Sequence, residues 1–280
     1  MRKFPIGIMT DSFKTDFRSA IEQAAKIGAA GVQTYCTSGA LSPEQMTREK
    51  ICEIKDIMQS NGMVFSAICG DLGHGFTDNE KNKEYIEQSK RIMELAKALD
   101  CNIVTTHIGV VPQDTNHPRY KIMQEACFEL AEFADSMQAH FAIETGPETS
   151  ATLKEFLDSL NSYGVAVNLD PANLVMVTGD DPVQAVYNLK DYIVHTHAKD
   201  GVKLCDSDPE VIYGMIEDVI QQGEVFREMP LGKGDVPFRE YLQALDEIGY
   251  TGFLTIEREV GDNPAADIQL AATFLRNMMK

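Results

Sequence analysis

Four short apolar runs in the second half of the chain each end in a residue that can bind a metal ion. The runs read His140-Phe-Ala-Ile-Glu144, Val165-Ala-Val-Asn-Leu-Asp170, Tyr192-Ile-Val-His-Thr-His197 and Phe253-Leu-Thr-Ile-Glu257. Each run is rich in β-branched residues, which is typical of a buried parallel strand. Parallel strands of one barrel open their C-terminal ends onto the same face. We therefore expect these four side chains to converge there.

Strand and helix signals alternate along the whole chain. Strand-like runs lie near residues 4–10, 31–36, 63–69, 102–107, 140–145, 165–170, 192–198 and 252–257. Between them lie segments with helical spacing of apolar residues, such as Phe17, Ala20, Ile21, Ala24 and Gly28, or Ala126, Cys127, Leu130, Ala134 and Met137. Eight strands, each followed by a helix, predict a (β/α)8 TIM barrel as a single domain over residues 1–280. A doubly wound open sheet is the alternative.

Local signals mark expected helix boundaries. Ser42-Pro43 and Asp181-Pro182 each place a capping residue before a first-turn proline, which is typical of a helix start. Gly28, Gly164 and Gly249 stand where a helix is expected to end in a left-handed residue.

One connection breaks this regularity. Residues 200–236 separate the seventh strand from a helix expected near Pro237, whereas such connections usually have ~2–6 residues. Residues 209–220 have the pattern of a short extra helix, and residues 231–235 have that of a turn. An insertion on this face of a barrel usually covers the site or shapes its specificity, so we expect a lid. A surface embellishment or a subunit contact is the alternative.

Composition limits the classes of function. The chain has 280 residues and a net charge of −18, which argues against a nucleic-acid partner bound through phosphate neutralisation. Its six cysteines include no C-x-x-C pair, as expected for thiols in a reducing cytoplasm. The apolar run after Met1 is too short for a signal peptide, and no run approaches the ~18 residues that span a membrane. We expect a cytoplasmic enzyme with a small neutral substrate and no membrane partner.

The predicted ligands are three carboxylates and one imidazole: Glu144, Asp170, His197 and Glu257. Charged residues are almost never buried unless they are paired or bound to metal, so their coincidence at four strand ends indicates a metal site. Such an oxygen-rich set suits Mn²⁺, Mg²⁺ or Co²⁺ better than a structural zinc ion. With three anionic ligands, the site suits a substrate that binds through hydroxyl and carbonyl oxygens.

Neighbouring polar residues have predicted supporting roles. His195, His197 and Lys199 alternate along one strand and therefore point to the same side. We expect His195 to lie one layer deeper in a hydrogen bond, and Lys199 to lie at the rim, where it could hold a substrate oxygen. Glu259, which shares a side with Glu257, is also expected at the rim.

The ligand order resembles that of the xylose isomerase-like TIM-barrel superfamily, which includes sugar and sugar-phosphate isomerases and epimerases, inosose dehydratase and endonuclease IV. The resemblance rests on Ala142-Ile-Glu144-Thr, Asn168-Leu-Asp170-Pro-Ala-Asn173-Leu, His195-Thr-His197-Ala-Lys-Asp200, Pro230-Leu-Gly-Lys-Gly-Asp235 and Thr255-Ile-Glu257-Arg-Glu. It covers essentially the whole chain. It is specific for the fold and the metal site, but not for the substrate.

The resemblance implies a metal-dependent isomerase or epimerase of a sugar or keto-sugar, acting through a metal-stabilised enediolate. In the family's epimerases, the residues matching Glu144 and Glu257 bind the metal and are also catalytic, one removing a proton and the other returning it. The resemblance implies one divalent ion, with Mn²⁺ expected first and Mg²⁺, Co²⁺ or Zn²⁺ as alternatives. It also implies a homo-oligomer, either a dimer or a tetramer.

The resemblance also points to substrate-binding residues. The family's ketose epimerases often carry histidine where this chain has Asn173, which can hydrogen-bond a sugar hydroxyl but cannot supply a proton. His107 could correspond to a zinc ligand of endonuclease IV. The third strand ends without histidine, however, and no Asp-x-His follows the seventh, so we expect His107 to bind substrate. Arg227 and Glu228 resemble a segment that borders the active site in related proteins. Asp11, Asp71 and His74 are weaker polar candidates at the same mouth.

Three alternatives remain open at this point. A dehydratase, which is a lyase, would use the same glutamates to eliminate water from a keto-inositol-like substrate. An endonuclease IV-like nuclease is disfavoured by the missing ligands and by the acidic charge. In a non-catalytic sugar-binding barrel, the paired glutamates would have no catalytic role.

Overall fold

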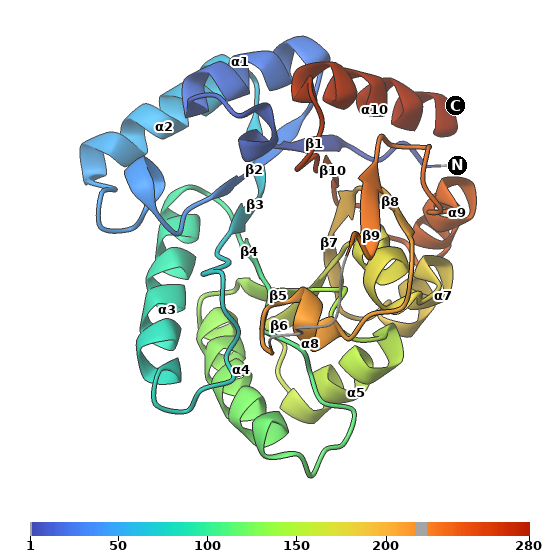
Figure 1. Cartoon of the computed structure of the whole chain (residues 1–280). Helices are drawn as coiled ribbons and strands as arrows, with labels where there is room; N and C mark the ends of the chain where they lie inside the picture. Colours follow the sequence, from blue (N-terminus) through green and yellow to red (C-terminus); the bar gives the residue numbers. More distant parts are fainter. Residues whose placement is uncertain (1, 217–222) are drawn as a thin grey trace.

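The computed structural model describes residues 2–216 and 223–280 and contains a closed parallel barrel (Figure 1). Its strands are β1 (Ile6–Met9), β2 (Gly31–Tyr35), β3 (Val64–Cys69), β4 (Ile103–Thr106), β5 (His140–Glu144), β6 (Val165–Leu169), β7 (Ile193–Ala198) and β10 (Leu254–Ile256). Neighbours around the barrel follow the order β1-β10-β7-β6-β5-β4-β3-β2. Strand β1 pairs with both β2 and β10, so the sheet has no free edge. The predicted TIM barrel is confirmed and the open sheet is excluded.

Helices surround the strands. The longer ones are α1 (Phe17–Ile27), α2 (Arg48–Ser60), α3 (Asn82–Ala98), α4 (Pro118–Ser136), α5 (Ser150–Leu160), α7 (Pro182–Asn188), α9 (Phe238–Glu247) and α10 (Pro264–Met278). Short turns η1 (Thr10–Phe13), η2 (Gly39–Leu41), α6 (Pro171–Asn173), η3 (Leu174–Thr178) and α8 (Pro209–Ile212) lie in the connections. Within the described ranges, none of the helices combines the length and apolar character needed to cross a bilayer.

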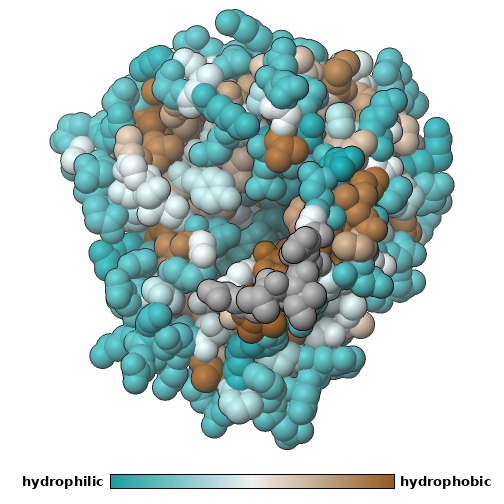
Figure 2. All heavy atoms as spheres, in the orientation of Figure 1, coloured by the Kyte–Doolittle hydropathy of each residue, from teal (hydrophilic) through white to brown (hydrophobic). Residues whose placement is uncertain are grey.

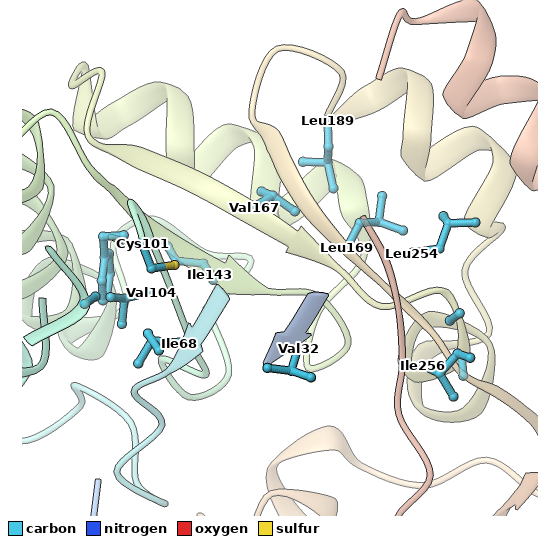
Figure 3. Packing of buried hydrophobic residues seen from close by; sticks show 14 of the residues in the cluster. Val32, Ile68, Cys101, Val104, Ile143, Val167, Leu169, Leu189, Leu254 and Ile256 are labelled. Carbon is cyan, nitrogen blue, oxygen red and sulfur yellow. The ribbon is translucent and has the colours of Figure 1, made fainter. Parts of the chain in front are cut away.

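The apolar core lies between the strands and the helices. Figure 3 shows Val167 and Leu169 of β6 packed near Leu189, which follows α7. Along β6 these residues alternate with Asn168 and Asp170, which therefore face the opposite side, the barrel interior. Burial of the outward-facing apolar residues holds the helices on the barrel. The inward-facing residues Asn168 and Asp170 are not needed for this packing.

The barrel interior contains polar side chains beneath the predicted ligands. Gln33, Ser66, Thr105, Asn168, His195 and Thr255 are all buried. Gln33 Nε2 donates to Thr105 Oγ1 at 2.9 Å, and His195 contacts Asn168 Oδ1 and Thr255 Oγ1, each at 2.8 Å. Burial and the neighbouring His197 hold the pKa of His195 well below its ordinary value. His195 is therefore a neutral, hydrogen-bonded residue of the interior, as predicted from its position.

The insertion at residues 200–236 contains an antiparallel hairpin. Strand β8 (Asp200–Lys203) pairs with β9 (Phe226–Met229), and both lie over the mouth side of the barrel with α8 (Figure 1). Sequence patterns missed this pair because four-residue strands are too short to show a clear period. Of the helix predicted over 209–220, the structure has α8 (Pro209–Ile212), and residues 217–220 lie outside the described residues.

Some boundary signals were right and others wrong. Asp181 caps α7, and Gly28 and Gly249 have left-handed φ angles of 81° and 78°. Ser42-Pro43 does not start a helix: α2 begins at Arg48, with Thr47 as its cap. Helix α5 ends in a left-handed Asn161 rather than at Gly164.

Gly164 is required for a different reason, which is close packing. A Cβ atom on this residue would lie 1.9 Å from the carbonyl oxygen of Ala131 in α4. Gly164→Ala therefore pushes α4 away from the barrel, and we expect a loss of roughly 2–3 kcal/mol in the free energy of unfolding. Urea denaturation measures this loss.

The control for Gly164→Ala is Gly62→Asn. Gly62 has φ +65° and nothing within 4 Å of an added Cβ, and asparagine tolerates left-handed φ. We expect this variant to unfold close to the wild type. Equal stability of Gly164→Ala and the wild type would contradict the packing argument.

Candidate metal centre

The four predicted ligands meet at the C-terminal end of the barrel. Glu144 ends β5, Asp170 follows β6, His197 lies in β7 and Glu257 follows β10. All four are at most 8% exposed, and one ligand atom from each lies within 4.8 Å of the others. His197 Nδ1 lies 3.2 Å from Asp170 Oδ2, 3.3 Å from Glu257 Oε2 and 3.6 Å from Glu144 Oε1. The structure thus brings together four residues that are far apart in the sequence.

Three carboxylates buried around one imidazole concentrate negative charge at this end of the barrel. Burial lowers the pKa of His197, but the carboxylates of Glu257 and Glu144 outweigh this effect and raise the pKa well above its ordinary value. A protonated His197 supplies only one positive charge against three carboxylates, and Lys199 adds one more, 3.0 Å from Glu257 Oε2. Hard carboxylate oxygens with one imidazole nitrogen are suitable ligands for a divalent ion. The cluster can therefore hold a metal ion.

Buried amides orient two of these ligands. Gln33 donates its Nε2 to Thr105, so its Oε1 is left to accept from His197 Nε2 at 2.9 Å. That bond keeps His197 Nδ1 directed at the carboxylates. Asn168 Nδ2 donates to Glu144 Oε2 at 2.9 Å. Gln33 and Asn168 were not predicted as supporting residues, although their polar side chains at inward positions of apolar strands are a signal that could have identified them.

Asp170 serves the site and the backbone together. Its Oδ1 accepts the N–H groups of Ala172 and Asn173 at 2.8 and 2.9 Å, which starts α6. Its Oδ2 is left facing His197. The Asn173 side chain then reaches back, and its Nδ2 donates to Glu144 Oε1 at 3.1 Å. The predicted substrate contact Asn173 thus lies beside a ligand.

His107 lies next to Glu144 at the end of β4. Its Nδ1 is 2.8 Å from Asp71 Oδ2, and its Nε2 is 3.7 Å from Glu144 Oε1. Among the described residues, Nε2 has no hydrogen-bond partner although it is buried. Burial lowers the pKa of His107, but Glu144 and Asp71 together raise it to about 9. His107 therefore presents an unused N–H beside the cluster, with Asp71 holding the ring.

Lys199, Arg227 and Glu228 occupy different places at the mouth. Lys199 is buried between Glu257 and Glu259, and it bonds to both. Arg227 is exposed and pairs with Glu224. Glu228 is buried and accepts from Arg258 Nη1 and from the backbone N–H of Glu259. In this structure Glu228 ties β9 to the segment after β10, and its contact with substrate remains a prediction.

A pocket of about 570 Å³ opens above the cluster, and Figure 2 shows the hollow in this face. All the predicted substrate-binding residues line it: His107, Asn173, Lys199, Arg227 and Glu228. Tyr213, just after α8, was not nominated from the sequence, yet its ring lies 5.5 Å from that of His107. A Cβ on Gly146 would lie 2.8 Å from Tyr213 Oη and 2.6 Å from Asn173 Cβ. Glycine at position 146 is therefore needed for both side chains to fit beside Glu144.

Glu148 is a buried carboxyl group outside the cluster. Its Oε2 accepts from the Val111 N–H at 3.1 Å. Burial raises the pKa of Glu148, whereas the Val111 hydrogen bond and His107 lower it. Burial has the larger effect, so the pKa is raised to about 8. At neutral pH the folded protein therefore keeps a largely protonated carboxyl here.

Comparisons with known proteins agree with this architecture. A family model described as a xylose isomerase-like TIM barrel matches residues 21–278. A xylose isomerase domain protein from Planctomyces limnophilus is 25% identical, with a TM-score of 0.80 over 98% of this chain and 96% of that one. The probable 3-DHS dehydratase AsbF from Bacillus anthracis is 18% identical, with a TM-score of 0.76 over 98% and 99% of the two chains. A D-psicose 3-epimerase from Clostridium cellulolyticum H10, solved with D-tagatose, is 17% identical, with a TM-score of 0.74 over 99% and 100%. The last two show likeness in fold alone.

Asp170→Asn tests the ligand set. Asparagine can still accept the N–H groups of Ala172 and Asn173, but it removes one anionic ligand. We expect Mn²⁺ affinity, measured by titration calorimetry, to fall by more than the ~10–100-fold typical of residues that only support a ligand. The metal-free variant should be at least as stable as the wild type because carboxylate repulsion is relieved.

The matched control is Asp181→Asn. Asp181 also precedes a proline and also caps a helix, with Oδ1 accepting from the Val183 N–H at 2.8 Å, but it is exposed and belongs to no cluster. This variant should bind Mn²⁺ like the wild type. Unchanged affinity in Asp170→Asn would remove Asp170 from the ligand set.

Glu148→Gln should change the pH dependence of stability. The folded pKa is about 8 against an ordinary value of 4.5, so the folded state keeps a proton that the unfolded state has lost. The contribution of Glu148 to the free energy of unfolding is therefore fully present below about pH 4.5 and is lost as the pH rises toward 8. At ~1.4 kcal/mol per pKa unit, Glu148→Gln should gain under about 1 kcal/mol over the wild type at pH 5 and up to about 4 kcal/mol at pH 8.

Urea denaturation at several pH values measures this difference, with the exposed Glu155→Gln as control. Glutamine preserves the acceptor for the Val111 N–H, so the loss of that bond is not a factor. A difference between Glu148→Gln and the wild type that does not vary with pH would show that Glu148 is ionised in the folded protein.

Proposed function

Because the chain belongs to the xylose isomerase-like TIM-barrel family, we propose that it is a divalent-metal-dependent isomerase or epimerase of a sugar or keto-sugar. The placement of two glutamates carries this proposal. Glu144 and Glu257 come from β5 and β10, the outer members of the arc β10-β7-β6-β5. Asp170 and His197 come from the two strands between them. A substrate bound over the cluster would have one carboxylate on each side.

The arrangement suits proton transfer next to a carbonyl group. When bound, a divalent ion stabilises the negative charge that a hydroxy-ketone develops as its C–H proton leaves. Burial raises the pKa of Glu257, but Lys199 and His197 outweigh this and keep it below its ordinary value, so Glu257 is an ionised acceptor. Glu144 is held by the amides of Asn168 and Asn173. One carboxylate removes the proton, and the other returns it from the opposite side.

Two further residues are suited to binding substrate oxygens. His107 has an unused Nε2, and its ring is fixed by Asp71. Lys199 has three N–H donors, of which Glu257 and Glu259 take two. These donors can orient hydroxyl or carbonyl oxygens while the glutamates act on the carbon. Asn173, Arg227 and Glu228 are proposed as further contacts from the pocket wall.

We also propose the identity of the metal ion and the oligomeric state of the protein. Mn²⁺ is the proposed ion because the ligands are mainly carboxylate oxygens, and Mg²⁺, Co²⁺ and Zn²⁺ are the competitors to include in metal titrations. A homo-oligomer, either a dimer or a tetramer, is proposed from the family relationship. Within residues 2–216 and 223–280, a single group of ligand-type side chains is close enough to bind a metal. This gives no support to a three-metal nuclease.

A dehydratase would use the same two glutamates, so the product distinguishes the two reactions. Elimination of water creates a conjugated chromophore, whereas isomerisation or epimerisation conserves the composition of the substrate. Absorbance and mass of the product therefore separate these outcomes in a single incubation.

Glu144→Gln and Glu257→Gln test the proton transfer. Glutamine preserves shape but cannot accept a proton, so each variant should lose turnover by ~10²-fold or more. The reaction is followed in D₂O with a panel containing D-psicose, D-tagatose and D-fructose, using NMR to detect deuterium at one substrate carbon. The exposed Glu240→Gln serves as control and should retain wild-type exchange. Turnover in which the substrate keeps its original hydrogen would contradict the proposal and indicate a hydride shift.

A further inference from the structure

The pocket above the cluster has two unlike sides. Charged and polar side chains form its floor: Glu144, Glu257, Lys199, His107 and Asp71. An apolar wall is formed by Met176, Val177, Ile212 and Phe226. These four come from η3, α8 and β9, segments inserted after β6 and β7. Figure 2 shows hydrophobic residues bordering the hollow in this face.

Packing of the hairpin explains only part of this apolar wall. A Cβ on Gly201 in β8 would lie 2.2 Å from Met176 Sδ, so Met176 lies tightly beneath the hairpin. Ile212 and Phe226 are only half-buried and line the pocket with the remainder of their surface. Apolar surface facing water costs about 25 cal/mol per Å². A ligand that covers Ile212 and Phe226 would remove this cost.

The charged residues beside the wall are already paired. Arg227 bonds to Glu224, and Arg258 bonds to both Glu228 and Asp267. Arg227 keeps free N–H groups but is exposed to water, so the donors sheltered inside the pocket are His107 Nε2 and Lys199 on its floor. A free ketose carries hydroxyl groups along its whole length. Those placed against the wall would lose water without gaining a partner, at about 1–3 kcal/mol each.

We propose that this pocket takes an α-hydroxy-ketone joined to an apolar substituent, with the substituent lying against the half-buried Ile212 and Phe226. The inference rests on the proposed function, because the hydroxy-ketone is the part that would bind at the cluster. The pocket volume of about 570 Å³ lies in the range that encloses ligands larger than one sugar unit. The floor then sets the chemistry, and the wall selects the substituent.

Two small ketones test the proposal directly. Hydroxyacetone and 2-hydroxyacetophenone share the same hydroxymethyl ketone and differ in a methyl against a phenyl group. Each is titrated into the Mn²⁺-loaded protein, and the relaxation of its protons by Mn²⁺ reports binding at the cluster even when affinity is weak. We expect the phenyl ketone to bind at least ~10-fold more tightly, because its ring covers the wall.

Two variants test which residues cause the preference for the phenyl ketone. Phe226→Ala and Ile212→Ala lie in separate segments, and each should reduce the affinity for 2-hydroxyacetophenone by ~3-fold or more while leaving that for hydroxyacetone unchanged. Phe128→Ala is the matched control, since Phe128 is exposed on α4, outside the pocket. It should retain the full preference.

The outcomes separate this inference from the proposed function. Equal affinity for the two ketones overturns the apolar-substituent proposal and leaves the metal-dependent function intact. A preference that persists in both Phe226→Ala and Ile212→Ala overturns the assignment to this wall. Absence of any Mn²⁺-induced relaxation for both ketones overturns the proposed function, and with it the inference that rests on it.

Discussion

Mutual repulsion among three buried carboxylates is the constraint on which the rest of the site depends. Glu144, Asp170 and Glu257 lie around His197 within 4.8 Å of one another, where little water can screen them. Such a group is stable only when positive charge and hydrogen-bond donors surround it. The pKa of His197 is raised by its neighbours and Lys199 is paired with Glu257. Both effects follow from the concentration of negative charge in the cluster.

Barrel closure makes this concentration of charge attainable. Strands β10, β7, β6 and β5 are neighbours in the sheet, so each contributes one predicted ligand to the same face. Beneath the ligands, Gln33, Asn168 and His195 form hydrogen-bonded pairs in place of the aliphatic layers usual in this fold. These amides orient His197 and Glu144 without adding charge. The polar interior and the ligand cluster therefore form one structural unit.

In the proposed function, chemistry and selectivity would be carried by different parts of the chain. The ligands and their supporting amides belong to barrel strands, whose positions are set by the sheet. The apolar wall belongs to η3, α8 and β9, which are connections outside the barrel. Loops tolerate change without loss of the scaffold, so the wall can change while the carboxylate cluster is preserved. The close approach of Gly201 to Met176 shows that the hairpin packs on η3.

Local patterns were sufficient to identify the barrel, its eight strands and the four side chains that meet at the ends of β5, β6, β7 and β10. A strand can be recognised from its own apolar residues. The residue that follows it lies at the C-terminal face of any parallel barrel. The cap of α7 at Asp181 was visible for the same local reason.

Other features depend on contacts between distant segments, which local patterns cannot show. Gly164 reads as a helix end, but packing against Ala131 is what requires it. Asp71 and His107, 36 residues apart, pair only because β3 and β4 are neighbours. Tyr213 reaches the site only because the hairpin folds over the mouth. The sequence by itself thus determined which side chains stand at the strand ends. Their partners, orientation and pocket came from tertiary packing, because burial and electrostatic coupling act between residues that only the closed barrel brings together.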